Sequence, residues 1–264
     1  MTHYDIQDWR RTYTGRAFEP RDLQIINRIG NPMQRILVMN SKGGSGKTTL
    51  ATNLCGYLAS KGEQVALFDY DPQGSSSHWL GRRAEQLPPI HGVEAFRAPP
   101  SGATRSWQMR LPPETERVIV DAPAGVGGVL LMDLIRSADV VLVPVLPSPI
   151  DLHAARNFII ELQRHGRQLG VVPQLGVVAN RVRRRTRAYQ SMTHALGEVG
   201  LPVAGVLRDT QNYVHAVESG RAVVELPSRA ARQDRCDWEH LGGWLDREQA
   251  ACMAYPEGMK RVHA

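Results

Sequence analysis

The stretch 40-NSKGGSGKTT-49 decides how the rest of the chain is interpreted. Its end, Gly46-Lys47-Thr48, matches the end of the phosphate-binding motif G-x-x-x-x-G-K-[ST]. The first glycine of that motif would fall at position 41, which is Ser41, and Lys42 follows where the motif specifies no residue. The stretch is therefore either a defective nucleotide site or a variant loop whose second lysine has its own task.

The segments on either side of the loop favour a working phosphate site. An apolar run, residues 35–40, precedes it, and a segment with helical character, residues 48–60, follows it. Glycines let the backbone N–H groups turn toward phosphate oxygens, and the start of the next helix adds partial positive charge. Lys47 would contact the β- and γ-phosphates, and the Thr48 hydroxyl would bind Mg²⁺. The candidate nucleotide-binding residues here are Gly43, Gly44, Ser45, Gly46, Lys47, Thr48 and Thr49.

Short apolar runs recur along the chain, each bounded by glycine, proline or a charged residue. They cover residues 35–40, 65–69, 117–121, 139–145, 175–180 and 203–207. Such runs are typical of strands that are buried on both faces of a parallel sheet. Helical segments alternate with them, as at residues 150–169, where apolar residues recur every four positions. The alternation predicts an α/β fold, a doubly wound, mostly parallel sheet flanked by helices, with its sites at the carboxyl ends of the strands.

The chain divides most simply into two parts. Residues 1–34 are polar and weakly periodic, and we expect them to form an N-terminal extension. No internal repeat or long low-complexity linker interrupts the remainder. We therefore expect one domain over residues 35–264.

Composition narrows the class of protein. The three cysteines (Cys55, Cys236 and Cys252) include no C-x-x-C pair, which argues against a disulfide framework, a zinc site or an iron–sulfur cluster. The first residues have no apolar core of signal-peptide length, and the longest apolar stretches are too short for a membrane span. We expect a cytoplasmic protein without membrane attachment.

The net charge of +6 is concentrated in one region. Between Glu161 and Glu198 there are seven arginines and no acidic residue, and the rest of the chain has 25 basic against 26 acidic residues. Such a patch binds polyanions or is simply a solvated face.

Aspartates end two of the predicted strands. Asp121 closes RVIVD, the arrangement of a Walker B carboxylate that holds Mg²⁺, often through water. Asp69 and Asp71, in VALFDYDPQG, follow another strand, where a carboxylate can orient or polarise an attacking water. A plain turn at the strand end is the alternative for Asp121 and Asp71.

The residues after the run at 175–180 bear on the choice of base. GTP-binding proteins read guanine with N-K-x-D, whose aspartate accepts the amino protons of the base. Here Asn180-Arg181-Val182-Arg183 places an arginine, which has no acceptor, at that position. ATP is therefore favoured, with Asn180 as a candidate for the adenine edge.

Four segments together resemble one family. SKGGSGKTT (41–49), FDYDPQGSSSHWLG (68–81), VIVDAPAG (118–125) and ADVVLVPVLPSPIDL (138–152) are similar to the deviant Walker A, Walker A′, Walker B and following strand of ParA/MinD ATPases. The match runs from about Arg35 to Glu225, and DPQG and P-S-P-I-D-L favour the ParA branch. The resemblance implies a P-loop NTPase fold and a ParA-like ATPase domain over residues 35–264.

The resemblance also implies roles for single residues. Lys42 looks like the signature lysine, which in the family crosses the dimer interface to the phosphates of the partner subunit. Asp71 resembles the hydrolytic aspartate, with Asp69 beside it, and Asp121 resembles the Walker B carboxylate. Family members use ATP and Mg²⁺ and form ATP-sandwich homodimers that bind DNA without sequence preference. They release the DNA after ATP hydrolysis, which a ParB-like or cargo-adaptor protein stimulates.

Lysine is scarce in this chain, which supports a special role for the loop lysines. Only Lys42, Lys47, Lys61 and Lys260 occur beside 28 arginines, and two of the four lie in the loop. A compact ammonium suits the crowded space between phosphates better than a planar guanidinium.

The run RVRRRTR lies near the region that family members use for DNA. The candidate DNA-binding residues are Arg181, Arg183, Arg184, Arg185 and Arg187. Arginines on phosphates bind through counterion release, and no base-reading motif accompanies them, so we expect contact that is independent of sequence. An exposed loop without a ligand is the alternative.

The leading hypothesis is a nucleoid-associated ParA-type ATPase that positions a plasmid, a chromosome or a protein assembly such as a carboxysome. A MinD-like membrane-associated regulator is the alternative, and a metabolic P-loop enzyme is a third. MinD-type members end in a basic amphipathic membrane helix. Here Trp238, Leu241 and Leu245 form an apolar stripe among acidic residues, and core packing is its expected use.

Overall fold

The computed structural model describes residues 33–99, 101–184, 186–198 and 202–253. At its centre lies a seven-stranded sheet in the order β3-β2-β4-β1-β5-β6-β7, in which each neighbouring pair is parallel. The strands are β1 (Gln34–Val38), β2 (Val65–Asp69), β3 (Ile90–Glu94), β4 (Arg117–Asp121), β5 (Val140–Val145), β6 (Gln174–Val182) and β7 (Val203–Arg208). The predicted doubly wound α/β fold is confirmed.

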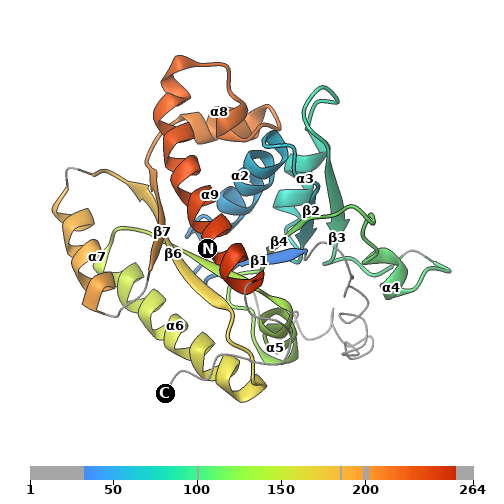
Figure 1. Ribbon diagram of the computed structural model, residues 1–264, viewed down its shortest axis with the longest axis horizontal. Coiled ribbons are helices and arrows are strands. Elements are labelled where there is room, and N and C mark those ends of the chain that lie inside the picture. The colour runs from blue at the N-terminus through green and yellow to red at the C-terminus, as the bar shows by residue number, and fades with distance from the viewer. Residues whose placement is uncertain (1–32, 100, 185, 199–201, 254–264) are drawn as a thin grey trace, which may run out of the picture.

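Helices cover both faces of this sheet (Figure 1). One layer consists of α5 (Gly128–Ser137), α6 (Pro149–Leu169) and α7 (Arg187–Glu198). The other layer consists of α2 (Lys47–Ser60), α8 (Asn212–Glu218) and α9 (Arg232–Met253), with α3 (Ser75–Gly81) packed beside α2. The connections also carry α4 (Arg105–Gln108) and two short 3-10 helices, η2 (Val223–Glu225) and η3 (Arg229–Ala231).

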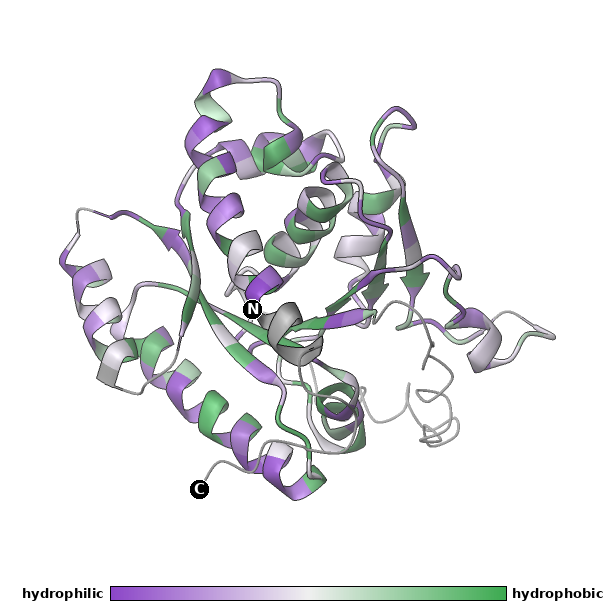
Figure 2. Ribbon diagram, in the orientation of Figure 1, coloured by the Kyte–Doolittle hydropathy of each residue, from purple (hydrophilic) through white to green (hydrophobic). Residues whose placement is uncertain are grey.

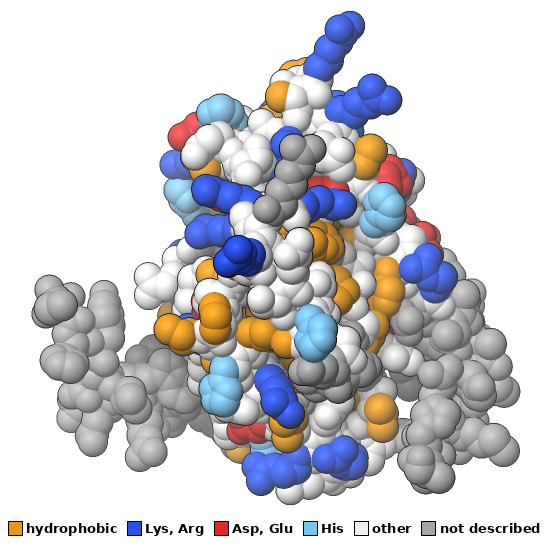
Figure 3. All heavy atoms as spheres, turned by 90° about the vertical axis from the view of Figure 1, so that its left-hand side faces the viewer, with side chains coloured by type: hydrophobic (Ala, Val, Ile, Leu, Met, Phe, Trp, Pro, Cys, Tyr) orange, Lys and Arg blue, Asp and Glu red, His pale blue; other side chains and the backbone are white. Residues whose placement is uncertain are grey.

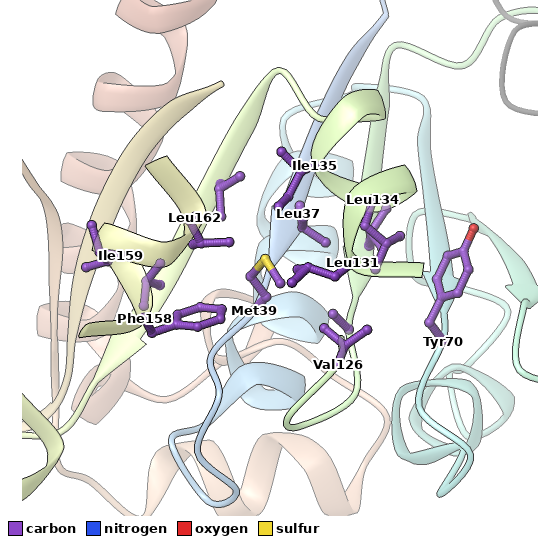
Figure 4. Packing of buried hydrophobic residues seen from close by; sticks show 14 of the residues in the cluster. Leu37, Met39, Tyr70, Val126, Leu131, Leu134, Ile135, Phe158, Ile159 and Leu162 are labelled. Carbon is purple, nitrogen blue, oxygen red and sulfur yellow. The ribbon is translucent and has the colours of Figure 1, made fainter. Parts of the chain in front are cut away.

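The central strands are buried on both faces because their side chains alternate between two apolar cores. In β1, Leu37 belongs to the core under α5 and α6, together with Met39 just after the strand, whereas Ile36 belongs to the core under α2 and α9. Figure 4 shows Met39 between Phe158 of α6 and Leu131 of α5. Figure 2 shows hydrophobic residues concentrated in the strands and hydrophilic ones on the outer turns of α6. Double burial explains why these strands have continuous apolar runs.

The apolar-run criterion missed β3 and shortened β6. Strand β3 lies at an edge of the sheet, and in its sequence IHGVE only Val93 is buried. An edge strand covered on few sides needs no continuous apolar run, so the pattern could not reveal it. Strand β6 extends to Val182, past the predicted end at residue 180, because its last residues pair with β7 around a bulge.

The predicted domain division stays a prediction. Residues 1–32 of the expected extension lie outside the described residues. The described fold begins with β1 at Gln34, one residue before the predicted boundary, and continues through α9.

The apolar stripe on α9 is part of the core. Trp238, Leu241 and Leu245 are fully buried under the sheet, and Trp238 Nε1 donates a hydrogen bond to the Tyr213 hydroxyl at 3.1 Å. Core packing of these residues, as predicted, is confirmed. Among the residues that the structure describes, none of the helices has the length and apolar character needed to cross a bilayer.

Replacing Trp238 with alanine should lower the free energy of unfolding by about 3–5 kcal/mol, because the substitution leaves a cavity between α9 and the sheet. Urea unfolding followed by circular dichroism measures the change. Trp107→Ala is the matched control, since Trp107 is 61% exposed and its loss should change stability by less than about 0.5 kcal/mol. Equal losses in the two variants would contradict the core assignment.

Candidate functional site at the carboxyl edge of the sheet

The predicted phosphate loop lies at the point where the strand order of the sheet reverses. Strand β1 lies between β4 and β5, the chain leaves β1 through residues 39–46, and α2 begins at Lys47. Because the strands are parallel, their carboxyl ends meet at one edge. Asp121 is aligned there with Val38 on one side and with Asp69 on the other. In open α/β sheets this switch point is where ligands bind.

The loop is tight, and its glycines have backbone angles that other residues rarely adopt. Gly46 has a φ of 93°, and a Cβ added to it would lie 2.1 Å from Asn180 Nδ2. Asn180 is buried beneath the loop, and its Nδ2 donates a hydrogen bond to the Ser45 carbonyl at 2.9 Å. Its Oδ1 accepts a hydrogen bond from the Arg181 backbone N–H at 2.9 Å. Asn180 therefore braces the phosphate loop, and its predicted contact with adenine stays a prediction.

Lys47 is the buried cation of the site. It is 7% exposed, and its Nζ donates a hydrogen bond to the Lys42 carbonyl at 3.1 Å. Burial lowers the pKa of Lys47, while the carboxylates of Asp121 and Asp71 oppose that change. The structure thus brings together three residues that lie far apart in the sequence.

The carboxylate of Asp121 has the features of a cation ligand. It is 1% exposed, and within the described residues neither of its side-chain oxygens accepts a hydrogen bond of normal geometry. Burial raises the pKa of Asp121 to about 7, and the nearby Thr48 hydroxyl limits the rise. A buried carboxylate without a donor, beside a hydroxyl, fits Mg²⁺, whose preferred ligands are oxygens. Thr48 and Asp121 are therefore the residues that would hold the metal.

Asp69 and Asp71 differ in their surroundings. Asp69 is buried, and its carboxylate accepts hydrogen bonds from the Asp71 backbone N–H at 3.0 Å and from the backbone N–H and hydroxyl of Ser77 at 2.9 and 2.8 Å. It therefore fixes the turn between β2 and α3. Asp71 is partly exposed, and one of its oxygens accepts a hydrogen bond from the Gln73 N–H at 3.0 Å. Its other oxygen accepts none from the described residues and can therefore accept one from a water.

Lys42 forms an ion pair with Asp151 at the start of α6. Its Nζ lies 2.8 Å from Asp151 Oδ1, and the two side chains are 38% and 21% exposed. Lys42 and the hydroxyl of Ser148, which donates to the other oxygen, lower the pKa of Asp151. Asp151 was not among the predicted site residues, although it belongs to the P-S-P-I-D-L segment. The only sequence signal for it was the helix cap formed by Ser148 and Pro149.

The arginine run begins within the last residues of β6 and continues beyond it, at the same edge of the sheet. Arg181 is exposed and has a φ of 51°, Arg183 and Arg184 form ion pairs with Asp209 and Asp237, and Arg187 begins α7. Arg185 lies outside the described residues. Figure 3 shows Lys and Arg side chains spread over the side of the molecule that carries α7, with few acidic side chains among them.

A glycine-rich loop between β1 and α2, a buried lysine and a strand-ending aspartate define a P-loop nucleotide-binding protein. Residues 36–223 match the family model described as the CobQ/CobB/MinD/ParA nucleotide binding domain. The chain therefore belongs to this family, and the predicted ParA/MinD resemblance is confirmed.

Two curated relatives agree with the ParA-type branch. The chain is 31% identical over 198 residues to maintenance of carboxysome distribution protein A of Halothiobacillus neapolitanus, covering 74% of this chain and 88% of the relative. It is 32% identical over 155 residues to the chromosome-partitioning ATPase Soj of Thermus thermophilus, covering 50% of this chain and 62% of the relative.

Solved structures share the fold. An ATP complex of McdA from Cyanothece matches with a TM-score of 0.59 and 20% identity, covering 81% of this chain and 98% of that one. MinD with Mg-ADP from Pyrococcus horikoshii matches with a TM-score of 0.59 and 17% identity, covering 85% and 100%. At these identities the likeness shows the fold alone.

The raised pKa of Asp121 predicts a pH-dependent stability. Folded Asp121 keeps its proton up to about pH 7, whereas the ordinary value is 3.8, so the folded state binds the extra proton between these values. The contribution of Asp121 to stability therefore falls as the pH rises through this window. Asp121→Asn lacks that loss, and without metal it should gain about 2–3 kcal/mol on the wild type between pH 5 and pH 8. Urea unfolding in EDTA measures both proteins, and a pH-independent difference would contradict the assignment.

Proposed function

We propose that this protein is a Mg²⁺-dependent ATPase that dimerises on ATP, binds DNA without sequence preference, and positions or segregates a cargo through partner-stimulated hydrolysis. The observation that carries the proposal is the second loop lysine, Lys42, beside a complete phosphate site. A simple phosphate-binding enzyme has no evident use for a second, partly exposed lysine in this loop.

ATP and Mg²⁺ would bind along the loop from Gly43 to Thr49. Backbone N–H groups and Lys47 would surround the phosphates, and Thr48 and Asp121 would hold the metal, which neutralises charge on the phosphates when it is bound. The burial of Lys47 supports this role, because a desolvated ammonium interacts more strongly with phosphate than a hydrated one. The ATP and Mg-ADP complexes among proteins of the same fold agree with this choice of ligand.

Hydrolysis would depend on Asp71. Its partly exposed carboxylate would orient the attacking water, and Asp69 would act by holding the turn that presents Asp71. Asp69 was predicted among the catalytic residues, and its three hydrogen bonds support a positioning role in the proposed reaction.

Dimerisation would use Lys42. To reach the phosphates of a partner subunit, its ammonium must leave Asp151. An ion pair between two partly exposed side chains contributes at most about 1 kcal/mol, so the phosphates of bound ATP can compete for the lysine. The dimer is thus proposed to exchange an internal ion pair for contacts across the interface.

The proposed function also includes binding to DNA and the positioning of a cargo. The exposed arginines at the end of β6 would contact phosphates of nucleoid DNA. The names of the relatives, maintenance of carboxysome distribution protein A and chromosome-partitioning ATPase Soj, suggest a protein assembly or a chromosome as cargo. A ParB-like or cargo-adaptor protein would stimulate hydrolysis.

Asp71→Ala should reduce ATP turnover by about a hundredfold or more, because the water loses its orienting group. The variant should still form ATP-dependent dimers and bind DNA. Phosphate release and size-exclusion chromatography with ATP measure the two properties. Lys47→Ala is the comparison variant and should lose ATP binding altogether. Unchanged hydrolysis in the Asp71 variant, or tight ATP binding in the Lys47 variant, would overturn the corresponding role.

Replacing Arg181 and Arg187 together with glutamine should weaken ATP-dependent DNA binding and reduce the slope of log K against log salt by about 2. Binding to a short duplex at several salt concentrations measures this slope. Arg82→Gln is the matched control, since Arg82 is an exposed arginine at the end of α3, outside the run RVRRRTR. A slope that is unchanged in the double variant, or ATP-dependent binding to anionic vesicles in place of DNA, would contradict the DNA proposal.

A further inference from the structure

The arginines of the run RVRRRTR are not equivalent, because two of them already have acidic partners. Arg183 pairs with Asp209, which follows β7, and Arg184 pairs with Asp237 on α9. Arg181 and Arg187 form no ion pair with the described residues. Of the four arginines of the run that the structure describes, a DNA phosphate would therefore have to compete for two and could approach the other two directly.

The pair between Arg183 and Asp209 lies at the surface. The two side chains are 76% and 38% exposed, and Nε and Nη2 of Arg183 both donate to Asp209 Oδ2, at 3.0 and 2.8 Å. If Arg183 moved away, water could solvate the Asp209 carboxylate without any change in the core. Such a pair is readily broken.

The pair between Arg184 and Asp237 has a buried side. Asp237 is 2% exposed, and its Oδ1 accepts hydrogen bonds from Arg184 Nη2 at 2.8 Å and from Gln233 Nε2 at 3.1 Å. Its Oδ2 has no hydrogen-bond partner within the described residues. If Arg184 moved to a phosphate, a buried carboxylate would lose the cation that compensates it, which is strongly unfavourable.

The neighbouring residues keep Asp209 in place for Arg183. The Asp209 backbone N–H donates to the Val182 carbonyl at 3.0 Å, which ties it to the end of β6. The adjacent Arg208 is not free to replace Arg183, because its Nε and Nη2 donate to both oxygens of the buried Asp234 at 2.5 and 2.8 Å. Among the residues that the structure describes, Arg183 is thus the cation paired with Asp209.

We propose that Asp209 competes with DNA phosphate for Arg183, so that Arg183 is a releasable DNA contact and Arg184 is a positioning residue that anchors the run to α9. The inference rests on the proposed DNA binding. On contact with DNA, a phosphate oxygen replaces the Asp209 carboxylate as the acceptor of Arg183, while Arg184 stays on Asp237. Asp209 thereby lowers the affinity for DNA and keeps binding reversible.

The test compares the affinity for a short DNA duplex in the presence of a non-hydrolysable ATP analogue. Asp209→Asn should tighten binding by roughly two- to fivefold, the range for release of a surface ion pair. The salt slope should stay nearly unchanged, because Arg183 contacts phosphate in both complexes and the number of phosphate contacts is the same. Glu218→Gln is the matched control, since it removes one exposed acidic charge at the end of α8 and should change affinity by much less.

Two further variants separate competition from general repulsion of DNA by Asp209. In an Arg183→Gln background, Asp209→Asn should give no gain, because the gain requires the released arginine. A gain that persists there, or an equal gain from Glu218→Gln, would overturn the inference. Arg184→Gln should lower the melting temperature by roughly 5 °C or more, whereas Arg183→Gln should leave it nearly unchanged. Equal melting temperatures would overturn the anchoring role of Arg184.

The outcomes also distinguish this inference from the function on which it rests. If the wild-type protein binds DNA with the ATP analogue and Asp209→Asn leaves the affinity unchanged, the competition fails and the DNA-binding function stands. If neither the wild type nor any variant binds DNA, the proposed DNA-binding function itself is overturned, together with the inference.

Discussion

The close approach of Gly46 to Asn180 is the constraint on which the site depends. The phosphate loop must turn within a few residues between β1 and α2, and only a residue without a side chain fits over the Asn180 amide with a φ of 93°. This contact ties the loop to the end of β6. It also connects the two charged regions of the molecule, since Arg181, the first arginine of the basic run, directly follows Asn180.

Burial divides the charges of the site into two groups. Lys47 and Asp121 are buried, and desolvation lowers the pKa of Lys47 and raises the pKa of Asp121, which favours the neutral form of each. A bound ligand of opposite charge would stabilise the charged form of each group. Lys42 and Arg183 lie at the surface, each held by an aspartate in an ion pair that a phosphate can replace. The buried group suits the binding of nucleotide and metal. The surface group suits contacts that form and break.

Much of this architecture could be predicted from local patterns. Glycines, a lysine and a threonine at fixed spacing indicated the phosphate loop, and continuous apolar runs indicated six of the strands, because both signals arise within a few consecutive residues. Strand β3 was not predicted, because it lies at the edge of the sheet and needs little burial. The ion pairs made by Asp151, Asp209 and Asp237 were not predicted, because each aspartate is far in sequence from its cation.

The sequence by itself thus determined the fold class, the position of the phosphate loop and the family, since these depend on spacing along the chain. Only the tertiary structure decided which charges are buried, which are paired and which remain available. Arg183 and Arg184 are adjacent and chemically identical in the sequence. One lies opposite an exposed aspartate and the other opposite a buried one, and the difference in solvation at those two carboxylates separates a releasable contact from an anchor.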